Sequence, residues 1–217
     1  MPGYVSSLVK VYLLDDHDIV RRGLRDLLAA ARDIQVVGDS SSTRDAAQAI
    51  LELETTVMVL DLQLQDGTGI EVCRDVRAVD PSVRGLLLTS YGEDEALTAA
   101  LLAGASGYIV KSSRGADIIG AVRRLGEGRT MIEPALAEAA IRRLTSQVTG
   151  PALTDRERVL LDLVLQGRTN GEIADHLDAE PGRVGAEIAG LIGRVRSTSA
   201  GPDHERGTEP PGRHRRA

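Results

Sequence analysis

Three aspartates stand at the ends of short apolar runs in the first third of this chain of 217 residues. Asp15 and Asp16 directly follow VKVYLL (9–14), and Asp61 lies near the end of TVMVLDL (56–62). If these runs are neighbouring strands of a parallel sheet, the carboxylates meet at its C-terminal edge, where open α/β sheets bind ligands. Carboxylates about 4 Å apart repel by about 4 kcal/mol per pair at an effective dielectric constant near 20, and Mg²⁺ relieves this through oxygen ligands. Because Asp15 or Asp16 alone would be read as a helix cap, the metal prediction rests on all three together.

Two further polar residues stand at the ends of similar runs. Thr89 lies near the end of VRGLLLTS (83–90), and Lys111 directly follows GYIV (107–110). A hydroxyl and an ammonium group beside a metal-bound carboxylate can bind the equatorial oxygens of a phosphoryl group, whose transfer needs mainly positioning and charge neutralisation. Taken singly, Thr89 is an ordinary strand hydroxyl and Lys111 a solvated lysine. Together with Asp61 they indicate phosphoryl chemistry.

A regular alternation of strands and helices must position these residues. Short apolar runs bounded by polar residues or glycine predict buried strands at 9–14, 35–38, 56–62, 83–90 and 107–110. Helical periodicity covers residues 17–32, 43–53, 69–79, 93–103 and 115–127. In the first of these helices the predicted apolar face consists of Ile19, Leu24, Leu27 and Leu28. The pattern predicts an α/β fold: a flavodoxin-like, five-stranded parallel sheet of order 2-1-3-4-5 with helices on both faces.

The remainder of the chain changes character after residue 127. Residues 128–152 predict a linker helix that opens near Pro134, followed by a hinge. Residues 153–196 predict a small all-α helix-turn-helix domain, with capping boxes at Thr154–Glu157 and Thr169–Glu172. Residues 197–217 are rich in Ser, Gly, Pro and charge, which predicts a disordered tail.

Composition limits the classes of protein that fit. The net charge of −6 and a pI of about 5.3 give no overall attraction to nucleic acid, so a DNA contact would need a local basic patch. A single cysteine, Cys73, excludes an intramolecular disulfide framework and is read as a small core or surface residue. We expect a cytoplasmic protein without membrane contact, since no apolar run has membrane-spanning length and the N-terminus does not resemble a signal peptide.

Four stretches of residues 8–127 resemble the receiver domain of two-component response regulators of the NarL/FixJ class. They are YLLDDHDIVRRGL, VLDLQLQDGTGIEVCRDVR, LLLTSYGEDEAL and GASGYIVK. The resemblance implies that residues 1–127 form a phosphoacceptor domain in which a sensor histidine kinase phosphorylates Asp61. It also implies that the protein promotes only its own phosphorylation and dephosphorylation and is not otherwise an enzyme. Homodimerisation on phosphorylation is a further expectation.

The same resemblance assigns roles to individual residues. It implies a Mg²⁺ ion held by three carboxylates and one backbone carbonyl, those of Asp15, Asp16, Asp61 and Gln63. It also implies that Thr89 and Tyr108 form a switch pair and that Lys111 contacts the phosphoryl group. One departure is Gln65, where the class usually has proline; it loosens the loop and touches no reacting atom.

LTDRERVLLDLVLQGRTNGEIADHL (153–177) resembles the LuxR-type helix-turn-helix that this class carries. The third helix departs from it, because Gly185 stands where lysine is expected, followed by Ala186 and Glu187. Major-groove reading needs donors and acceptors, and phosphate contact needs Lys or Arg. The output domain is therefore predicted to be degenerate, with weak DNA contacts from Arg183, Arg194 and Arg196.

Three functions are weighed from the sequence. The first is a transcription regulator that binds DNA under the control of Asp61 phosphorylation. The second is a response regulator that acts through protein contacts or phosphate buffering, without specific DNA binding. The third, a metal-dependent phosphohydrolase, is weakest, because no second acid–base residue or substrate pocket is visible.

Overall fold

The computed structural model describes residues 8–90, 93–148, 154–165, 168, 170–180, 183–188 and 190–191. Its centre is a five-stranded parallel sheet in the order β2-β1-β3-β6-β7. The strands are β1 (Val9–Leu14), β2 (Ile34–Ser40), β3 (Val57–Asp61), β6 (Arg84–Thr89) and β7 (Gly107–Val110). Counted along this sheet, the order is 2-1-3-4-5, which confirms the predicted flavodoxin-like topology.

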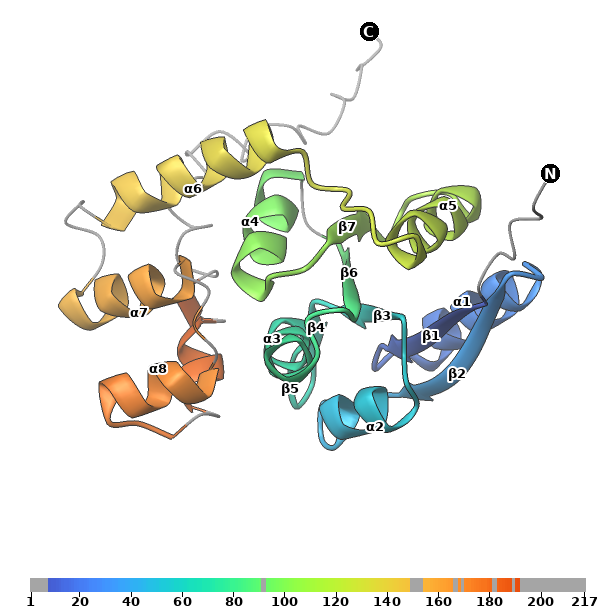
Figure 1. Ribbon diagram of the computed structural model, residues 1–217, viewed down its shortest axis with the longest axis horizontal. Helices are drawn as coiled ribbons and strands as arrows, with labels where there is room; N and C mark the ends of the chain where they lie inside the picture. The colour runs from blue at the N-terminus through green and yellow to red at the C-terminus, as the bar shows by residue number, and fades with distance from the viewer. Residues whose placement is uncertain are drawn as a thin grey trace, which may run out of the picture.

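Helices cover both faces of this sheet (Figure 1). On one face, α1 (Asp18–Ala29) and α5 (Gly115–Gly126) pack against Val11 and Leu13 of β1. On the other face, α2 (Ala46–Glu52), α3 (Gly69–Val79) and α4 (Glu93–Ala103) pack against Tyr12 and Leu14. Successive strand side chains point to opposite faces, so a continuous apolar run supplies both layers of the core. All residues of β3 are buried for this reason.

The first helix is shorter than predicted, and one residue of its expected apolar face is wrong. Leu24 and Leu28 are buried and Leu27 is partly buried, but Ile19 is 87% exposed. Because α1 begins only at Asp18, Ile19 lies in the first turn, at the edge of the sheet rather than over its face. Cys73 is buried in the α3 face of the core, as a small core residue would be.

A small hairpin connects β3 to α3 and fixes the end of β3. It consists of β4 (Gln63–Leu64) and β5 (Gly67–Thr68), which pair antiparallel. Thr68 then caps α3 through a capping box with Glu71. The helix can start here only with a glycine, because a Cβ on Gly69 would lie 2.2 Å from the backbone oxygen of Asp61. The hairpin and this close approach hold the backbone of Asp61 at the sheet edge.

The second part of the chain is helical. It contains α6 (Pro134–Val148), α7 (Asp155–Leu165) and α8 (Asn170–Leu177), and residues 183–188 and 190–191 are also helical. The capping box predicted at Thr154 is confirmed: its N–H donates to Glu157 Oε2 at 2.8 Å, and the Glu157 N–H donates to its Oγ1 at 3.4 Å. The second predicted capping box needs Thr169, which lies outside the described residues, as do residues 192–217.

The core does not end at the receiver-like sheet. Val184, Ile188 and Leu191 of the third helix are buried with α7 and α8, and they belong to the same hydrophobic cluster as the α3 and α4 face of the sheet. In Figure 1, α7 and α8 lie beside α3 and α4, on the side of the molecule away from α1. The two halves of the chain therefore pack against each other.

Candidate functional site

The three predicted carboxylates meet at the C-terminal edge of the sheet. Asp15 is fully buried and Asp61 is 5% exposed, because they end adjacent central strands. One ligand atom each from Asp15, Asp16, His17 and Asp61 fits within 4.8 Å. His17 Nδ1 lies 2.8 Å from Asp16 Oδ1 and 3.2 Å from Asp15 Oδ1. The edge of the sheet therefore carries a compact cluster of these four side chains, here called the acidic pocket.

Lys111 reaches into this pocket from the end of β7. Its Nζ donates to Asp61 Oδ2 at 2.7 Å and lies 2.9 Å from Asp15 Oδ2. Its backbone N–H donates to the Thr89 carbonyl at 2.7 Å, which extends the β6–β7 pairing to the strand ends. Thr89 is 1% exposed at the end of β6. The structure thus brings together the five residues that the sequence predicts at strand ends: Asp15, Asp16, Asp61, Thr89 and Lys111.

The predicted switch pair lies on one face of the sheet. Tyr108 is partly buried against the cluster that contains Leu87, and it pairs with Leu87 in the β6–β7 ladder. Thr89 follows Leu87 by two residues, so its side chain points to the same face, toward α3 and α4. Gln63, the fourth predicted metal-binding residue, has an exposed side chain, and its backbone N–H donates to Asp61 Oδ1 at 3.4 Å.

The charges of the pocket oppose each other. Burial raises the pKa of Asp61, and the Asp15 carboxylate adds to this, while the hydrogen bond and charge of Lys111 act in the other direction. Burial also acts to lower the pKa of Lys111, but its contacts with Asp61 and Asp15 outweigh this, so its pKa is raised. Lys111 therefore remains a cation beside a carboxylate that is costly to keep ionised.

The carboxylate oxygens fit a hard divalent cation. Asp15 Oδ2 and Asp16 Oδ1 are buried and accept no hydrogen bond, although Lys111 and His17 lie within ion-pair distance. Buried carboxylate oxygens without hydrogen bonds are stabilised by a bound cation with oxygen preference. The acidic cluster can therefore bind a metal ion.

The raised pKa of Asp61 has a consequence for stability. In metal-free buffer at neutral pH, we expect Asp61→Asn to raise the melting temperature by a few degrees, at about 2–4 °C for each kcal/mol in a chain of this size. A carboxyl whose folded pKa is raised favours folding below its unfolded pKa, and this contribution is lost as pH rises through the folded pKa. The gain should therefore shrink as pH falls, and the two melting curves should converge in acid.

Calorimetry from pH 7.5 down to pH 4 measures this difference, with the exposed Asp26→Asn as a matched control. A wild-type protein that melts above Asp61→Asn at neutral pH without metal would contradict the prediction.

Sequence reasoning missed two features, one at this site and one at the contact between the two halves of the chain. The first is His17, whose ring lies against the acidic pocket; its position directly after Asp15-Asp16 was the available signal. The second is Asn170, which is 4% exposed and bonded to the receiver half. No sequence signal marks it, because its partner lies 96 residues away.

The predicted DNA-contacting arginines are only partly described. Arg183 Nε donates to Glu187 Oε1 at 3.1 Å, and Arg156 Nε lies 3.1 Å from Glu187 Oε2. Burial acts to raise the pKa of Glu187, but these two arginines outweigh it and hold the pKa below its usual value. Arg194 and Arg196 lie outside the described residues. Arg183 is thus engaged by an acid of its own helix.

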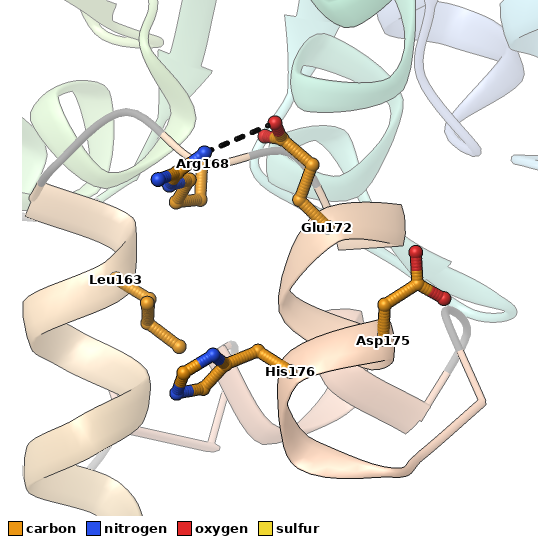
Figure 2. Close-up of a pocket in the computed structure, with 5 residues that line it drawn as sticks. All are labelled: Leu163, Arg168, Glu172, Asp175 and His176. Atoms are coloured by element: carbon orange, nitrogen blue, oxygen red, sulfur yellow. Dashed lines mark hydrogen bonds and ion pairs between the residues drawn. The ribbon is translucent and has the colours of Figure 1, made fainter.

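A hollow lies between α7 and α8, far along the chain from the acidic pocket. Figure 2 shows its lining: Leu163, Arg168, Glu172, Asp175 and His176. Arg168 Nη1 lies 3.3 Å from Glu172 Oε1 across one end of it. This hollow contains none of the residues predicted for phosphoryl or DNA chemistry.

The outer side of the third helix is partly covered by α3. Gly185 is buried, and a Cβ built on it would lie 2.3 to 2.8 Å from side-chain atoms of Glu71. Ala186 is exposed next to it. The position where the LuxR-type pattern has lysine therefore faces the receiver half in this structure.

A doubly wound parallel sheet whose central strand ends in Asp61, beside Asp15, Thr89 and Lys111, has the architecture of a receiver domain. The chain belongs to the response regulator family: the model of the response regulator receiver domain matches residues 11–123. The chain is 45% identical over 174 residues to the "DNA-binding transcriptional activator DevR/DosR" of Mycobacterium tuberculosis, covering 78% of this chain and 80% of that one. It is 34% identical to the response regulator protein VraR of Staphylococcus aureus, covering 76% and 80% of the two chains.

Solved structures agree with this assignment. A LuxR-family two-component response regulator from Aurantimonas sp. SI85-9A1 superposes with a TM-score of 0.56 at 32% identity, covering 64% of this chain and 99% of that one. The response regulator ChrA of a heme-sensing two-component system gives 0.50 at 30% identity, covering 90% and 99%. Among the helices of the described residues, none combines the length and apolarity needed to cross a membrane.

Proposed function

We propose that this chain is a cytoplasmic two-component response regulator in which a sensor histidine kinase phosphorylates Asp61 with Mg²⁺ bound, and in which this controls a LuxR-type helix-turn-helix. The observation that carries the proposal is the position of Lys111 Nζ, 2.7 Å from Asp61 and 2.9 Å from Asp15. The name of the mycobacterial relative, a transcriptional activator that binds DNA, supports the output. We propose regulation, not catalysis on a separate substrate, as its role.

The chemistry follows from the pocket. An Asp61 carboxylate oxygen attacks the phosphorus atom and forms an acyl phosphate, while the bond to the donor histidine breaks. Lys111 neutralises charge on the transferred group, and the Thr89 hydroxyl can donate to one of its oxygens. Asp15, Asp16, Asp61 and the Gln63 carbonyl would hold Mg²⁺, which supplies further charge neutralisation when bound.

The new group changes the pocket because it adds about −1.5 to −2 charge beside Lys111. We propose that Thr89 moves toward the phosphoryl oxygens and that Tyr108 turns into the vacated space. The face formed by α4, β7 and α5 then shifts between two packings, and homodimerisation follows.

Two substitutions test this switch. We expect Thr89→Ala and Tyr108→Ala to leave phosphorylation of Asp61 largely intact, because neither residue supplies or receives the phosphoryl group. Each should abolish the change in sedimentation coefficient that phosphorylation produces in the wild type. A wild-type protein whose sedimentation does not respond to phosphorylation would remove the basis of the switch.

DNA binding by the wild type should be weak and mostly electrostatic. Three phosphate contacts, from Arg183, Arg194 and Arg196, predict a log–log salt slope of about −3 at roughly −0.9 per phosphate, with little discrimination between sequences. A selection from a random DNA library with the phosphorylated full-length protein, followed by fluorescence polarisation over a salt series, measures both. Tight, sequence-selective binding would show that the third helix is not degenerate.

A second candidate function is output through protein contacts or phosphate buffering without specific DNA binding. The ion pairs of Glu187 with Arg156 and Arg183 favour it, because they engage Arg183, one of the predicted phosphate contacts, and hold a carboxylate beside it. Failure of the selection to enrich any sequence, with Asp61 phosphorylated, would support this candidate.

A further inference from the structure

A buried arginine joins the receiver to the helix-turn-helix. Arg74 lies on α3 and is 8% exposed. Its Nε donates to Asn170 Oδ1 at 2.8 Å, its Nη1 donates to the Leu102 carbonyl at 2.9 Å, and its Nη2 donates to the Arg168 carbonyl. One guanidinium group therefore holds the last turn of α4 and the beginning of α8 at the same time.

All three acceptors are neutral, which makes this contact sensitive to their positions. Burial lowers the pKa of Arg74, but a guanidinium stays charged in proteins, so its N–H groups need acceptors whenever water is excluded. Its donors form a rigid planar fork, so they cannot follow acceptors that move independently. If the domains separate, water replaces the two acceptors of the helix-turn-helix. The docked and separated arrangements then differ little in hydrogen bonding, as a switch requires.

The contact extends along one stripe of α3. Asn170 Nδ2 donates to Asp75 Oδ1 at 3.3 Å, and Asn170 Oδ1 accepts from Arg74. The side-chain amide of Asn170 therefore contacts two neighbouring residues of α3, one through its nitrogen and one through its oxygen. Glu71 lies against Gly185. Glu71, Arg74 and Asp75 have the spacing i, i+3 and i+4, which places them on the same side of the helix. Two separate segments of the helix-turn-helix thus rest on one surface of the receiver.

The third acceptor connects this surface to the phosphorylation site. Leu102 lies in the last turn of α4, and α4 follows the strand that ends at Thr89. A movement of α4 changes the place of the Leu102 carbonyl relative to Arg74. When that acceptor moves away, the guanidinium can regain full hydrogen bonding only by admitting water, which requires the helix-turn-helix to separate from α3.

We propose that Arg74 is a positioning residue that couples the place of α4 to the docking of this chain's own helix-turn-helix on α3. The coupling rests on the proposed function, because it uses the movement of α4 on phosphorylation. The docking itself does not, because it concerns the unphosphorylated protein.

Hydrogen exchange of the full-length protein, followed by mass spectrometry, tests the docking. In Arg74→Met we expect the α3 and α8 peptides of the unphosphorylated protein to exchange about tenfold faster, since a difference of 1.4 kcal/mol corresponds to a factor of ten. Arg77→Met is the matched control, because Arg77 lies on the same helix and, among the described residues, donates to the Pro81 and Val83 carbonyls of the receiver. Unchanged exchange in Arg74→Met, or equal acceleration in Arg77→Met, would overturn the proposal.

An exchange of charges guards against a variant that simply unfolds. Asn170→Asp alone should loosen the contact, because the new carboxylate faces Asp75. Adding Asp75→Asn should restore protection, because the introduced carboxylate accepts from Arg74 and the introduced amide donates back. If the double variant exchanges as fast as Asn170→Asp alone, the assigned hydrogen bonds are contradicted, provided that peptides of β1 and β3 stay protected from exchange in both variants.

Phosphorylation tests the coupling. In the wild type, acetyl phosphate with Mg²⁺ should accelerate exchange in α8, whereas Arg74→Met should show no further acceleration. The mass of the Asp61 peptide reports phosphorylation separately. Phosphorylated wild type with unchanged α8 exchange would overturn the coupling, whereas absence of the phosphoryl group would count against the proposed function and leave the docking comparison standing.

Discussion

Asp61→Asn protein treated with acetyl phosphate and Mg²⁺ is expected to gain no phosphoryl group, whereas wild-type protein gains one. An amide is not a nucleophile at phosphorus, and no neighbouring carboxylate can take over. Asp15 is fully buried, with its oxygens engaged by His17 and Lys111, and Asp16 Oδ1 lies against His17. Asp61 lies at the end of a central strand, and its carboxylate lies next to Lys111, so we expect it to be the residue that accepts the phosphoryl group.

Intact-mass measurement and peptide mapping give the result directly. Asp26→Asn, on the exposed side of α1, should label as the wild type does. Wild-type protein in EDTA should also fail to label, since repulsion between three carboxylates and an incoming phosphoryl group is then not relieved. Labelling of Asp61→Asn at the wild-type level, or full labelling in EDTA, would show that another residue or another mechanism is at work.

The second large effect concerns the third helix. Gly185→Lys combined with Ala186→Asn should raise DNA affinity roughly tenfold or more at low salt, because one phosphate contact and one base-reading amide are added, each worth on the order of 1 kcal/mol or more. The salt slope should steepen by about 0.9. The lysine also opposes docking on α3, since its Cβ would lie 2.3 to 2.8 Å from side-chain atoms of Glu71, which could move aside only by leaving its capping box with Thr68.

Two simpler variants separate these effects. Gly185→Ala adds only the overlapping Cβ, so it should release the helix without adding a phosphate contact. Ala186→Asn adds the amide at an exposed position and should leave docking unchanged. Fluorescence polarisation over a salt series compares all four proteins. Absence of binding by the double variant would favour output through protein contacts.

The acidic pocket was predictable because strand ends are visible in sequence. β1, β7, α3 and α4 begin and end where the pattern places them, so the residues that follow each strand converge as expected. Lys111 is the clearest case: alone it is an unremarkable lysine, but the end of β7 places its Nζ 2.7 Å from Asp61. The roles of Thr89, Tyr108 and Gln63 in phosphoryl and metal binding remain predictions.

The contact between the two halves of the chain was not predictable. Arg74 and Asn170 are separated by 96 residues, and each taken alone is an ordinary helical polar residue. The sequence shows that Gly185 stands where the LuxR-type pattern has lysine. Helical periodicity, however, does not reveal that α3 of the receiver covers this side of the helix. Ile19 shows the opposite error. Its spacing matches the apolar face of the helix, but the sheet does not extend under it and its side chain is exposed. Such features depend on which surfaces meet, and that is decided by the whole chain.

The hydrophobic cluster that runs from Leu14 and Leu87 of the sheet to Val184 and Ile188 of the third helix has a thermodynamic meaning. Elements that share one core lose it together, so the output helices of the docked protein unfold in the same cooperative transition as the sheet. Separation of the halves divides that transition in two and leaves a small helical unit of about 40 residues with a core of its own, near the size at which isolated domains become marginal. Under the proposed coupling, activation therefore lowers heat resistance. The form released for output is the form most readily lost to unfolding and proteolysis, which limits its lifetime.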